Sequence, residues 1–443
     1  MPNPVPVAQF LVLQVIDSAK ISVYFIKNCM MRKLFTFAFA VSMAVSSMSA
    51  AKFDNGIFIL NEDWFGHNAS SVNFYSYDDN SILYHAYQAA NPGLTLGNTS
   101  QFAELGTENI YFCSKQNYGT TGGRLIVADA KTLASKASIE AFGADTRAFV
   151  SIDDSKAYIS TSGGIYTFDK TTNTVGEAIE GTTGKEVGNM ALVRGKVLGT
   201  ARGTGIYVIN TLTDELEKTV AIGDITTVFV VNGQPYAAVN NAGFGAPKET
   251  DTEQFVKLNP ETFEPDETLT VPMASQNTWF AWKNCVPAID EQNEVLYYSP
   301  YENCKFISKY DLKTGEFVKE FINFDGKQTM YGSVVGYDPE NHYVVAATFE
   351  TYASKNYWLN IYDTNGNPVK TMPLSKNYWF PAMLLFAHSK APSAVDDVNA
   401  TKTVASVQYV NLQGQVSAEP FAGVNIKVVT YTDGSQSASK IMK

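Results

Sequence analysis

Tryptophan and tyrosine side chains gather in the segments between the strand-like stretches of this 443-residue sequence. Such side chains combine a large rigid surface with one polar atom, which is typical of recognition surfaces. Polar residues nearby supply the few directional contacts that a ligand pocket needs. The predicted ligand-contacting residues are Trp64, Phe65, His67, Gln101, Lys115, Tyr118, Arg147, Trp279, Trp282, Tyr331 and Trp379, with Asn61, Glu62, Asp63 and Gln116 as further polar candidates.

Residues capable of acid–base, nucleophilic or metal chemistry are sparse. The chain has four histidines, no nucleophile elbow, no zinc-binding helix motif and no CxxC pair. Glu62 and Asp63 are adjacent, and adjacent side chains on an extended chain point apart, which argues against a carboxylate pair for glycoside cleavage. The sequence therefore predicts a non-enzymatic binding protein with no metal and no cofactor. A hydrolase or lyase is the less favoured alternative.

The charge balance narrows the choice of partners. The net charge is −11 and no run of basic residues occurs, so nothing neutralises phosphates and a nucleic-acid partner is excluded. Three cysteines lie beyond the N-terminal region, namely Cys113, Cys285 and Cys304. A Cys285–Cys304 disulfide is conceivable, but three cysteines make no disulfide framework and buried thiols are favoured.

A repeated phrase indicates the elements that carry these loops. An alternating strand, then Asp or Asn, then a tight turn recurs seven times, at intervals of 40 to 52 residues. The turn residues of the copies are Asp78, Asp129, Asp169, Asn210, Asn259, Asp311 and Asp363. This period suits a four-stranded blade with the phrase on its third strand, and predicts an all-β, seven-bladed β-propeller over residues 52–389. A two-sheet sandwich or a solenoid is the alternative.

The first blade lacks an innermost strand of its own, because the predicted mature sequence begins with a strand at residues 56–61. An orphan strand-like stretch at residues 382–388 follows the seventh copy, so we expect it to complete the first blade and close the ring. In such a ring the second-to-third-strand loops and the connections between blades share one face. The aromatic residues fall in these loops, where they form a binding face or, alternatively, plug the centre of the ring.

The N-terminal region resembles an export signal. Residues 30–51 combine a short basic start, an apolar stretch and small residues before Ala51, as in a secretory signal peptide. Residues 1–29 precede it and are expected to be an extension of the gene model. A membrane-anchoring helix is the alternative, although the apolar run is short for a membrane span.

The C-terminal residues form a separate small unit. A linker at 390–397 leads to a predicted β-module over 398–443 with Tyr409, Asn411, Leu412 and Gly414 in its first half. Together with Gly423-Val424-Asn425-Ile426, Asp433-Gly434 and Lys443, these residues resemble the sorting domain of the type IX secretion system of Bacteroidetes. That resemblance implies surface attachment or release, while a module that caps the propeller is the alternative.

Segments along the propeller resemble a known family. Residues 61–67 (NEDWFGH), 98–102, 122–132, 163–172, 277–282 and 330–340 are similar to exported YncE-like, surface-layer-type propellers of Bacteroidetes. Related propellers of the BtuG type capture corrinoids and pass them to an outer-membrane transporter. They carry a lipidation cysteine, which this sequence lacks.

The resemblance implies a secreted or cell-surface protein that captures a small extracellular ligand, with a corrinoid as the first candidate and a glycan as the second. Its implied partners are an outer-membrane transporter or the secretion machinery. A structural or adhesive surface protein that binds another protein is the alternative function.

Overall fold

The structure is a computed structural model that describes most of the chain beyond residue 52. The described residues are 53–140, 142, 144–201, 203–223, 225–240, 253–271, 286–301, 303–332, 334–388, 404–411, 413–432 and 436–442. The predicted signal peptide, the stretch before it, Cys285, Trp279 and Trp282 lie outside them.

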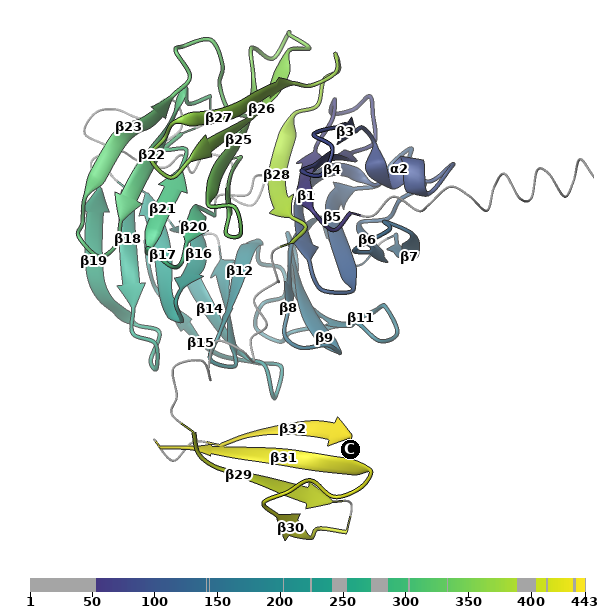
Figure 1. The fold of residues 1–443 in the computed structure, drawn as a ribbon, viewed down its shortest axis with the longest axis vertical. Helices are drawn as coiled ribbons and strands as arrows, with labels where there is room; N and C mark the ends of the chain where they lie inside the picture. The colour runs from purple at the N-terminus through teal and green to yellow at the C-terminus, as the bar shows by residue number, and fades with distance from the viewer. Residues whose placement is uncertain are drawn as a thin grey trace, which may run out of the picture. The chain divides into compact units, whose positions relative to one another are not determined.

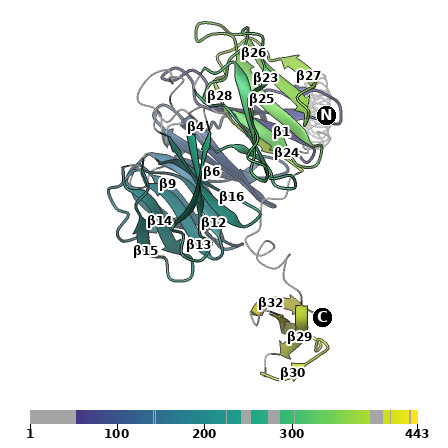
Figure 2. The same ribbon diagram turned by 90° about the vertical axis from the view of Figure 1, so that its left-hand side faces the viewer.

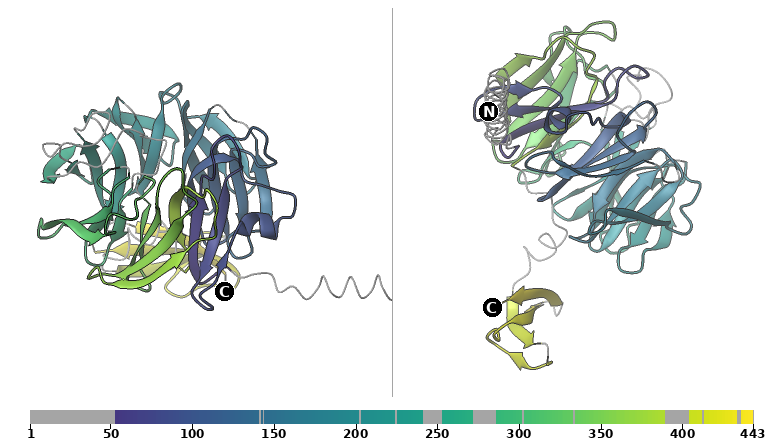
Figure 3. Two further views of the ribbon diagram at one scale, coloured as in Figure 1. Left: turned by 90° about the horizontal axis from the view of Figure 1, so that it is seen from above. Right: turned by 90° about the vertical axis from the view of Figure 1, so that its right-hand side faces the viewer.

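Seven four-stranded antiparallel sheets follow one another along the chain and form the blades of a β-propeller (Figures 1 and 3). Blade 1 comprises β28 (Pro381–Phe386), β1 (Gly56–Asn61), β2 (Ser71–Ser76) and β3 (Ile82–Leu83). Blade 2 comprises β4 (Asn98–Leu105), β5 (Asn109–Gln116), β6 (Leu125–Asp129) and β7 (Ser135–Ile139). Blade 3 comprises β8 (Thr146–Ser151), β9 (Lys156–Thr161), β10 (Gly164–Asp169) and β11 (Thr174–Ala178).

The remaining four blades repeat this order of strands. Blade 4 comprises β12 (Val187–Val193), β13 (Lys196–Ala201), β14 (Gly205–Asn210) and β15 (Glu215–Val220). Blade 5 comprises β16 (Ile225–Val231), β17 (Gln234–Asn240), β18 (Glu253–Leu258) and β19 (Pro265–Val271). Blade 6 comprises β20 (Ala288–Asp290), β21 (Val295–Tyr298), β22 (Phe306–Asp311) and β23 (Phe317–Asn323). Blade 7 comprises β24 (Val335–Asp338), β25 (Tyr343–Phe349), β26 (Tyr357–Asp363) and β27 (Pro368–Pro373).

The ring closes inside blade 1. The last propeller strand, β28, pairs antiparallel with β1, with Leu385 opposite Phe58 and Leu384 opposite Ile59 (Figure 1). Blade 1 therefore takes its innermost strand from the end of the propeller sequence and the other three from its start. The expected seven blades and their closure by the last strand are confirmed, and closure leaves β1 without an open edge.

The hydrophobic core is divided among the interfaces between neighbouring blades. Each of the seven clusters of buried apolar side chains joins two adjacent blades, including blades 7 and 1. Between blades 2 and 3, for example, the rings of Tyr111 and Phe149 stack with centroids 4.2 Å apart. A middle strand such as β14 is buried on both faces, whereas the outer strand β15 mostly alternates between exposed and partly buried residues. This pattern explains the high aromatic content, because large rings fill the space between sheets.

The repeated Asp or Asn shapes the turn between the third and fourth strand. In blade 3, Asp169 Oδ1 accepts hydrogen bonds from the backbone N–H groups of Thr171 (2.7 Å) and Thr172 (3.0 Å). The same side-chain-to-backbone bonding occurs at Asp129, Asn210, Asn259, Asp311 and Asp363. In blade 1, Asp79 rather than the predicted Asp78 accepts from the backbone, at Ser81 N–H. The turn begins one residue later there because β2 ends at Ser76 and two further residues precede it.

The connections differ between the two faces of the ring. Turns between the first and second strands, and between the third and fourth, share what we call the turn face. Loops between the second and third strands, and between blades, share the loop face. The second-to-third-strand loop covers residues 62–70 in blade 1 but only 162–163 in blade 3. The length of these loops therefore differs between blades.

A further four-stranded sheet lies near the C-terminus (Figure 2). Its strand order is β30 (Val416–Ser417), β29 (Val404–Asn411), β31 (Val424–Tyr431) and β32 (Gln436–Met442). One short helix, α2 (Ala86–Ala90), connects blades 1 and 2. In the part of the chain that the structure describes, no helix has the length and apolar character needed to cross a membrane. Cys113 and Cys304 are buried free thiols, as favoured above.

Candidate functional site

The loop that follows β1 is joined to the segment that precedes β28. The backbone N–H of Glu62 donates to Phe380 O (3.0 Å), and that of Asp63 donates to Trp379 O (2.9 Å). Asp63 and Phe380 both adopt the left-handed backbone region, with φ of 58° and 42°. Aspartate tolerates this region, which many turns of this chain also use, whereas a bulky residue such as Phe380 is strained in it. The two ends of the propeller sequence thus meet in one strained junction on the loop face.

A buried carboxylate holds three blades together beneath this junction. Glu62 Oε2 accepts a hydrogen bond from Tyr331 Oη (2.9 Å) and another from Gln101 Nε2. Tyr331 precedes the first strand of blade 7, Gln101 lies in β4 of blade 2, and Glu62 follows β1 of blade 1. Hydrogen bonds to a charged acceptor are the stronger ones, so Glu62 fixes the relative positions of these segments.

Asp63 lies in a different environment although it is adjacent in sequence. Its Oδ2 accepts a hydrogen bond of 2.5 Å from Ser71 Oγ, whereas its Oδ1 has no hydrogen-bond partner among the described residues. Burial raises the pKa of Asp63 well above its usual range, and the bond from Ser71 opposes this only in part. The two adjacent carboxyl groups have different partners, as the sequence indicated, so they do not face one common point.

Exposed and partly buried rings cover this junction and form an aromatic shelf, defined by the exposed Trp64, His67 and Tyr352 and the partly buried Tyr378 and Phe380. Trp64 is 42% exposed and stacks on His67 with ring centroids 3.7 Å apart. Tyr378 lies 4.8 Å from Trp64, and 6.3 Å from Phe380 in a nearly parallel orientation. Phe380 in turn stacks on Tyr352 at 6.0 Å. The rings form a continuous row, and their residues come from blades 1 and 7. Such a row is suited to bind a ligand with an apolar or planar face.

One predicted ligand residue belongs to the core instead. Trp379 is 1% exposed, packs in the cluster between blades 7 and 1, and stacks on Tyr84 at 5.4 Å. Its indole N–H donates to Ser375 O (2.8 Å), which satisfies its polar atom in the interior. The expectation that Trp379 lines an open concave surface is therefore wrong. Its neighbour Phe380 contributes to the shelf because the left-handed backbone there turns consecutive side chains in different directions.

The predicted polar residues lie beneath the surface. Gln101, Lys115 and Arg147 are 4%, 1% and 6% exposed. Gln101 binds Glu62, and Arg147 Nη2 forms an ion pair with Glu186 Oε1 (2.9 Å). These three side chains are therefore buried below the loop face rather than open on it.

The remaining predicted ligand residues differ in where they lie and in how exposed they are. Phe65 and Tyr118 are 56% and 52% exposed, Tyr331 is partly buried against Phe380, and His67 is exposed on the shelf. Trp279 and Trp282 lie outside the described residues. Sequence reasoning missed Tyr352, Tyr378 and Phe380, although all three fall within aromatic loops at 348–358 and 375–381. Their proximity follows from ring closure, which brings blade 7 against blade 1.

The site offers binding chemistry. Among the described residues, no group of three or more His, Cys, Asp and Glu is placed to hold a metal ion. The shelf supplies stacking surfaces, and Lys355 Nζ lies 5.0 Å from the centroid of the Tyr378 ring. The arrangement is suited to holding a ligand with both an apolar face and polar edges.

Known proteins share the architecture. A search of curated proteins gave no match. A crystal structure of a protein from Lactobacillus plantarum matches 75% of this chain and 99% of its own at 10% identity, with a TM-score of 0.51, which bears on the fold alone. The match to dihydro-heme d1 dehydrogenase NirN covers 76% of this chain and 76% of that chain at 14% identity, with a TM-score of 0.48. The match to Kuenenia stuttgartiensis hydrazine synthase covers 77% of this chain and 96% of that chain at 11% identity, with a TM-score of 0.47. Because its model matches residues 55–387, the chain belongs to the family described as "Domain of unknown function (DUF5074)".

Proposed function

We propose that this propeller is an exported, non-enzymatic binding protein that captures a small extracellular ligand on the aromatic shelf. The observation that carries the proposal is the row of rings from the exposed Trp64 through the partly buried Tyr378 and Phe380, held by the strained junction below it. Exposed aromatic groups on a rigid support reduce the entropic cost of binding, because little must be ordered when the ligand arrives. Export rests on the predicted signal peptide at residues 30–51.

A corrinoid is the first candidate ligand and a glycan the second. A corrinoid has a broad, largely apolar ring with polar substituents at its edge, which matches a row of rings bordered by Lys355. The resemblance to exported corrinoid-binding propellers supports this choice, with an outer-membrane transporter as the partner. Sugar rings also stack on Trp and Tyr, so a glycan fits the same surface.

Binding of the full chain to cyanocobalamin and to a neutral oligosaccharide, measured by isothermal titration calorimetry, tests the proposal. For whichever probe binds, Trp64→Ala should weaken the affinity about tenfold to a hundredfold, because a well-packed aromatic anchor contributes about 1–3 kcal/mol to binding. Leu212→Ala is the matched control, since Leu212 is 91% exposed on the turn face of blade 4. Failure of both probes to bind, or equal affinity of Trp64→Ala and wild type, would contradict the proposal.

A protein-binding, adhesive role is the second candidate. It is favoured by the exposure of Phe65 and Tyr118, which lie in the loops of two neighbouring blades. If the loop face binds a surface protein, Phe65→Ser combined with Tyr118→Ser should release the protein from the outer-membrane fraction of its native host. If the double variant stays in the outer-membrane fraction, the adhesive role is contradicted and the small-ligand proposal is the remaining candidate.

A further inference from the structure

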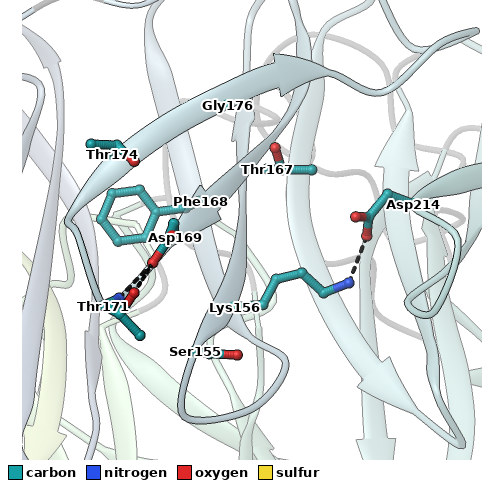
Figure 4. A pocket seen from close by; sticks show the side chains of 9 residues that line it. All are labelled: Ser155, Lys156, Thr167, Phe168, Asp169, Thr171, Thr174, Gly176 and Asp214. Atoms are coloured by element: carbon teal, nitrogen blue, oxygen red, sulfur yellow. Dashed lines mark hydrogen bonds and ion pairs between the residues drawn. The ribbon is translucent and has the colours of Figure 1, made fainter.

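An open pocket of about 340 Å³, here called the cavity, lies on the surface of the turn face between blades 3 and 4, with Asp169, Thr174 and Gly176 exposed to solvent (Figure 4). It lies between the outer part of blade 3 and the turn that follows β14 in blade 4. The lining residues used below are Lys156, Thr167, Asp169, Thr174, Gly176 and Asp214. The volume is at the lower end of the range for small-molecule sites, which begins at about 300 Å³.

A glycine helps to create the space. Gly176 lies in β11 beside β10, and a Cβ atom at this position would lie 2.3 Å from Thr167 Oγ1. Any side chain here would therefore displace the Thr167 hydroxyl or occupy the cavity. Thr167 Oγ1 has only a long contact of 3.5 Å, to Glu177 O, so its hydroxyl is available to a ligand.

An ion pair spans the cavity from one blade to the next. Lys156 Nζ lies 2.8 Å from Asp214 Oδ1 and also donates to Thr211 O, while Tyr158 Oη donates to Asp214 Oδ1. Figure 4 shows the Lys156 side chain extended toward Asp214 across the opening. These contacts occupy Asp214 Oδ1 and hold the two walls at a fixed separation, so the cavity is built by the native contacts of both blades.

Two carboxylate oxygens remain as acceptors. Asp169 uses Oδ1 for its turn, and neither Asp169 Oδ2 nor Asp214 Oδ2 makes a hydrogen bond within the described residues. Hydrogen bonds from the side chain and backbone of Thr171 and from Thr172 N–H lower the pKa of Asp169, which keeps its carboxyl group ionised. One lysine and two aspartates give the lining an excess of negative charge, which disfavours anionic ligands.

We propose that this cavity binds a neutral sugar unit through its hydroxyl groups. Hydroxyl groups of the sugar donate to the carboxylate oxygens of Asp169 and Asp214, and the Thr167 hydroxyl donates to or accepts from another hydroxyl. The site lies on the face opposite to the aromatic shelf and goes beyond the function proposed above. It is independent of that function, because its residues belong to blades 3 and 4 and not to the shelf.

Titration of the full chain with maltose, cellobiose and lactose, followed by saturation-transfer NMR and calorimetry, tests this inference. At least one disaccharide should bind, and Thr167→Val and Asp169→Asn should each weaken that binding about tenfold, the usual effect of losing a hydrogen bond to a charged or buried group. Glucuronic acid should not bind. The methyl glycoside of the sugar that binds should then be titrated as well. It mimics a sugar unit within a chain, so binding of the methyl glycoside indicates a chain-linked unit, and its failure to bind indicates a free reducing sugar.

Asp311→Asn is the matched control, because Asp311 makes the same turn in blade 6 and lies outside the cavity. Asparagine preserves such a turn, as Asn259 does in blade 5. Trp64→Ala should leave unchanged the disaccharide binding that Thr167→Val weakens, which separates this site from any sugar binding on the shelf. Absence of binding by all three disaccharides, or unchanged affinity in both Thr167→Val and Asp169→Asn, would overturn the proposal.

Discussion

The two faces of the ring use the same blades for different chemistry. On the loop face, blades 7 and 1 present exposed rings over a strained junction at Asp63 and Phe380. On the turn face, short turns shaped by a repeated Asp or Asn present hydroxyl and carboxylate groups. Repetition fixes the turn face, because each blade needs the same tight turn, whereas the longer loops are free to differ between blades.

Buried carboxyl groups show the same contrast. Asp338, at the end of β24 on the turn face, accepts hydrogen bonds from Tyr77 Oη (2.7 Å) and Asn341 Nδ2 (3.0 Å), and it lies 2.6 Å from His388 Nε2. Asp63 on the loop face accepts one side-chain hydrogen bond, from Ser71. Burial raises the pKa of both carboxyl groups, and Glu62 raises that of Asp63 further, whereas the hydrogen bonds to Asp338 outweigh its burial and lower its pKa. The surroundings of Asp338 thus stabilise a negative charge that the surroundings of Asp63 do not.

Removal of the closing strand should have the largest effect. Truncation after Pro381 deletes most of β28, which exposes the edge of β1 and opens the ring. We expect insoluble protein or the loss of a cooperative thermal transition. Truncation after His388 is the control, since it retains β28 and should melt like the propeller of the full chain. A folded, cooperative Pro381 truncation would show that closure is not needed, and that the junction on the loop face forms without it.

Substitution of two tryptophans on the loop face compares a buried ring with an exposed one. Trp379→Ala should lower the free energy of unfolding by about 3–5 kcal/mol, because it leaves a cavity between blades 7 and 1. Trp64→Ala should change it by less than about 1 kcal/mol, since Trp64 is an exposed loop residue. Denaturant unfolding of both variants checks this. Similar losses in the two would mean that the shelf plugs the ring rather than binds a ligand.

The propeller architecture could be predicted from the sequence because the blades repeat. Asp129, Asp169 and Asp311 each mark a turn whose hydrogen bonds are local, so their spacing predicts the blades directly. The site depends on contacts between distant segments, such as Glu62 with Tyr331, which no local pattern encodes. Trp379 was assigned to the surface because a loop tryptophan gives no sign of its direction, and its left-handed neighbour Phe380 could not be foreseen from side-chain type.

Replacement of Asp338 tests whether its surroundings stabilise a negative charge. Burial raises the pKa of Asp338, but hydrogen bonds from Asn341, His388 and Tyr77 outweigh it and leave the pKa lowered. A lowered folded-state pKa stabilises the protein above the unfolded value of about 3.9, and this contribution is lost as the pH falls through the folded-state pKa. Asp338→Asn should therefore cost about 2 kcal/mol at pH 7 and progressively less below pH 4.

Denaturant unfolding of wild type and Asp338→Asn between pH 7 and pH 2 measures this difference. His388→Gln is a useful companion, because it removes the contact with Asp338 and leaves the bonds from Tyr77 and Asn341. Its cost should be smaller than that of Asp338→Asn. A stability difference that is constant over the whole pH range would mean that the Asp338 charge is not stabilised by its partners.

Asp63 should respond in the opposite sense, with the smallest effect. Its folded-state pKa is raised by burial, so the native state holds the proton more tightly, and stability declines as the pH rises from about 4 through the folded-state pKa. Asp63→Asn removes this decline, tolerates the left-handed backbone and can still accept the bond from Ser71. We expect a gain of about 1 kcal/mol at pH 8 and no gain at pH 4, measured by denaturant unfolding. A loss comparable to that of Asp338→Asn would mean that Asp63 is ionised and stabilised by its surroundings, so Asp63 and Asp338 would not differ in the charge state that their surroundings favour.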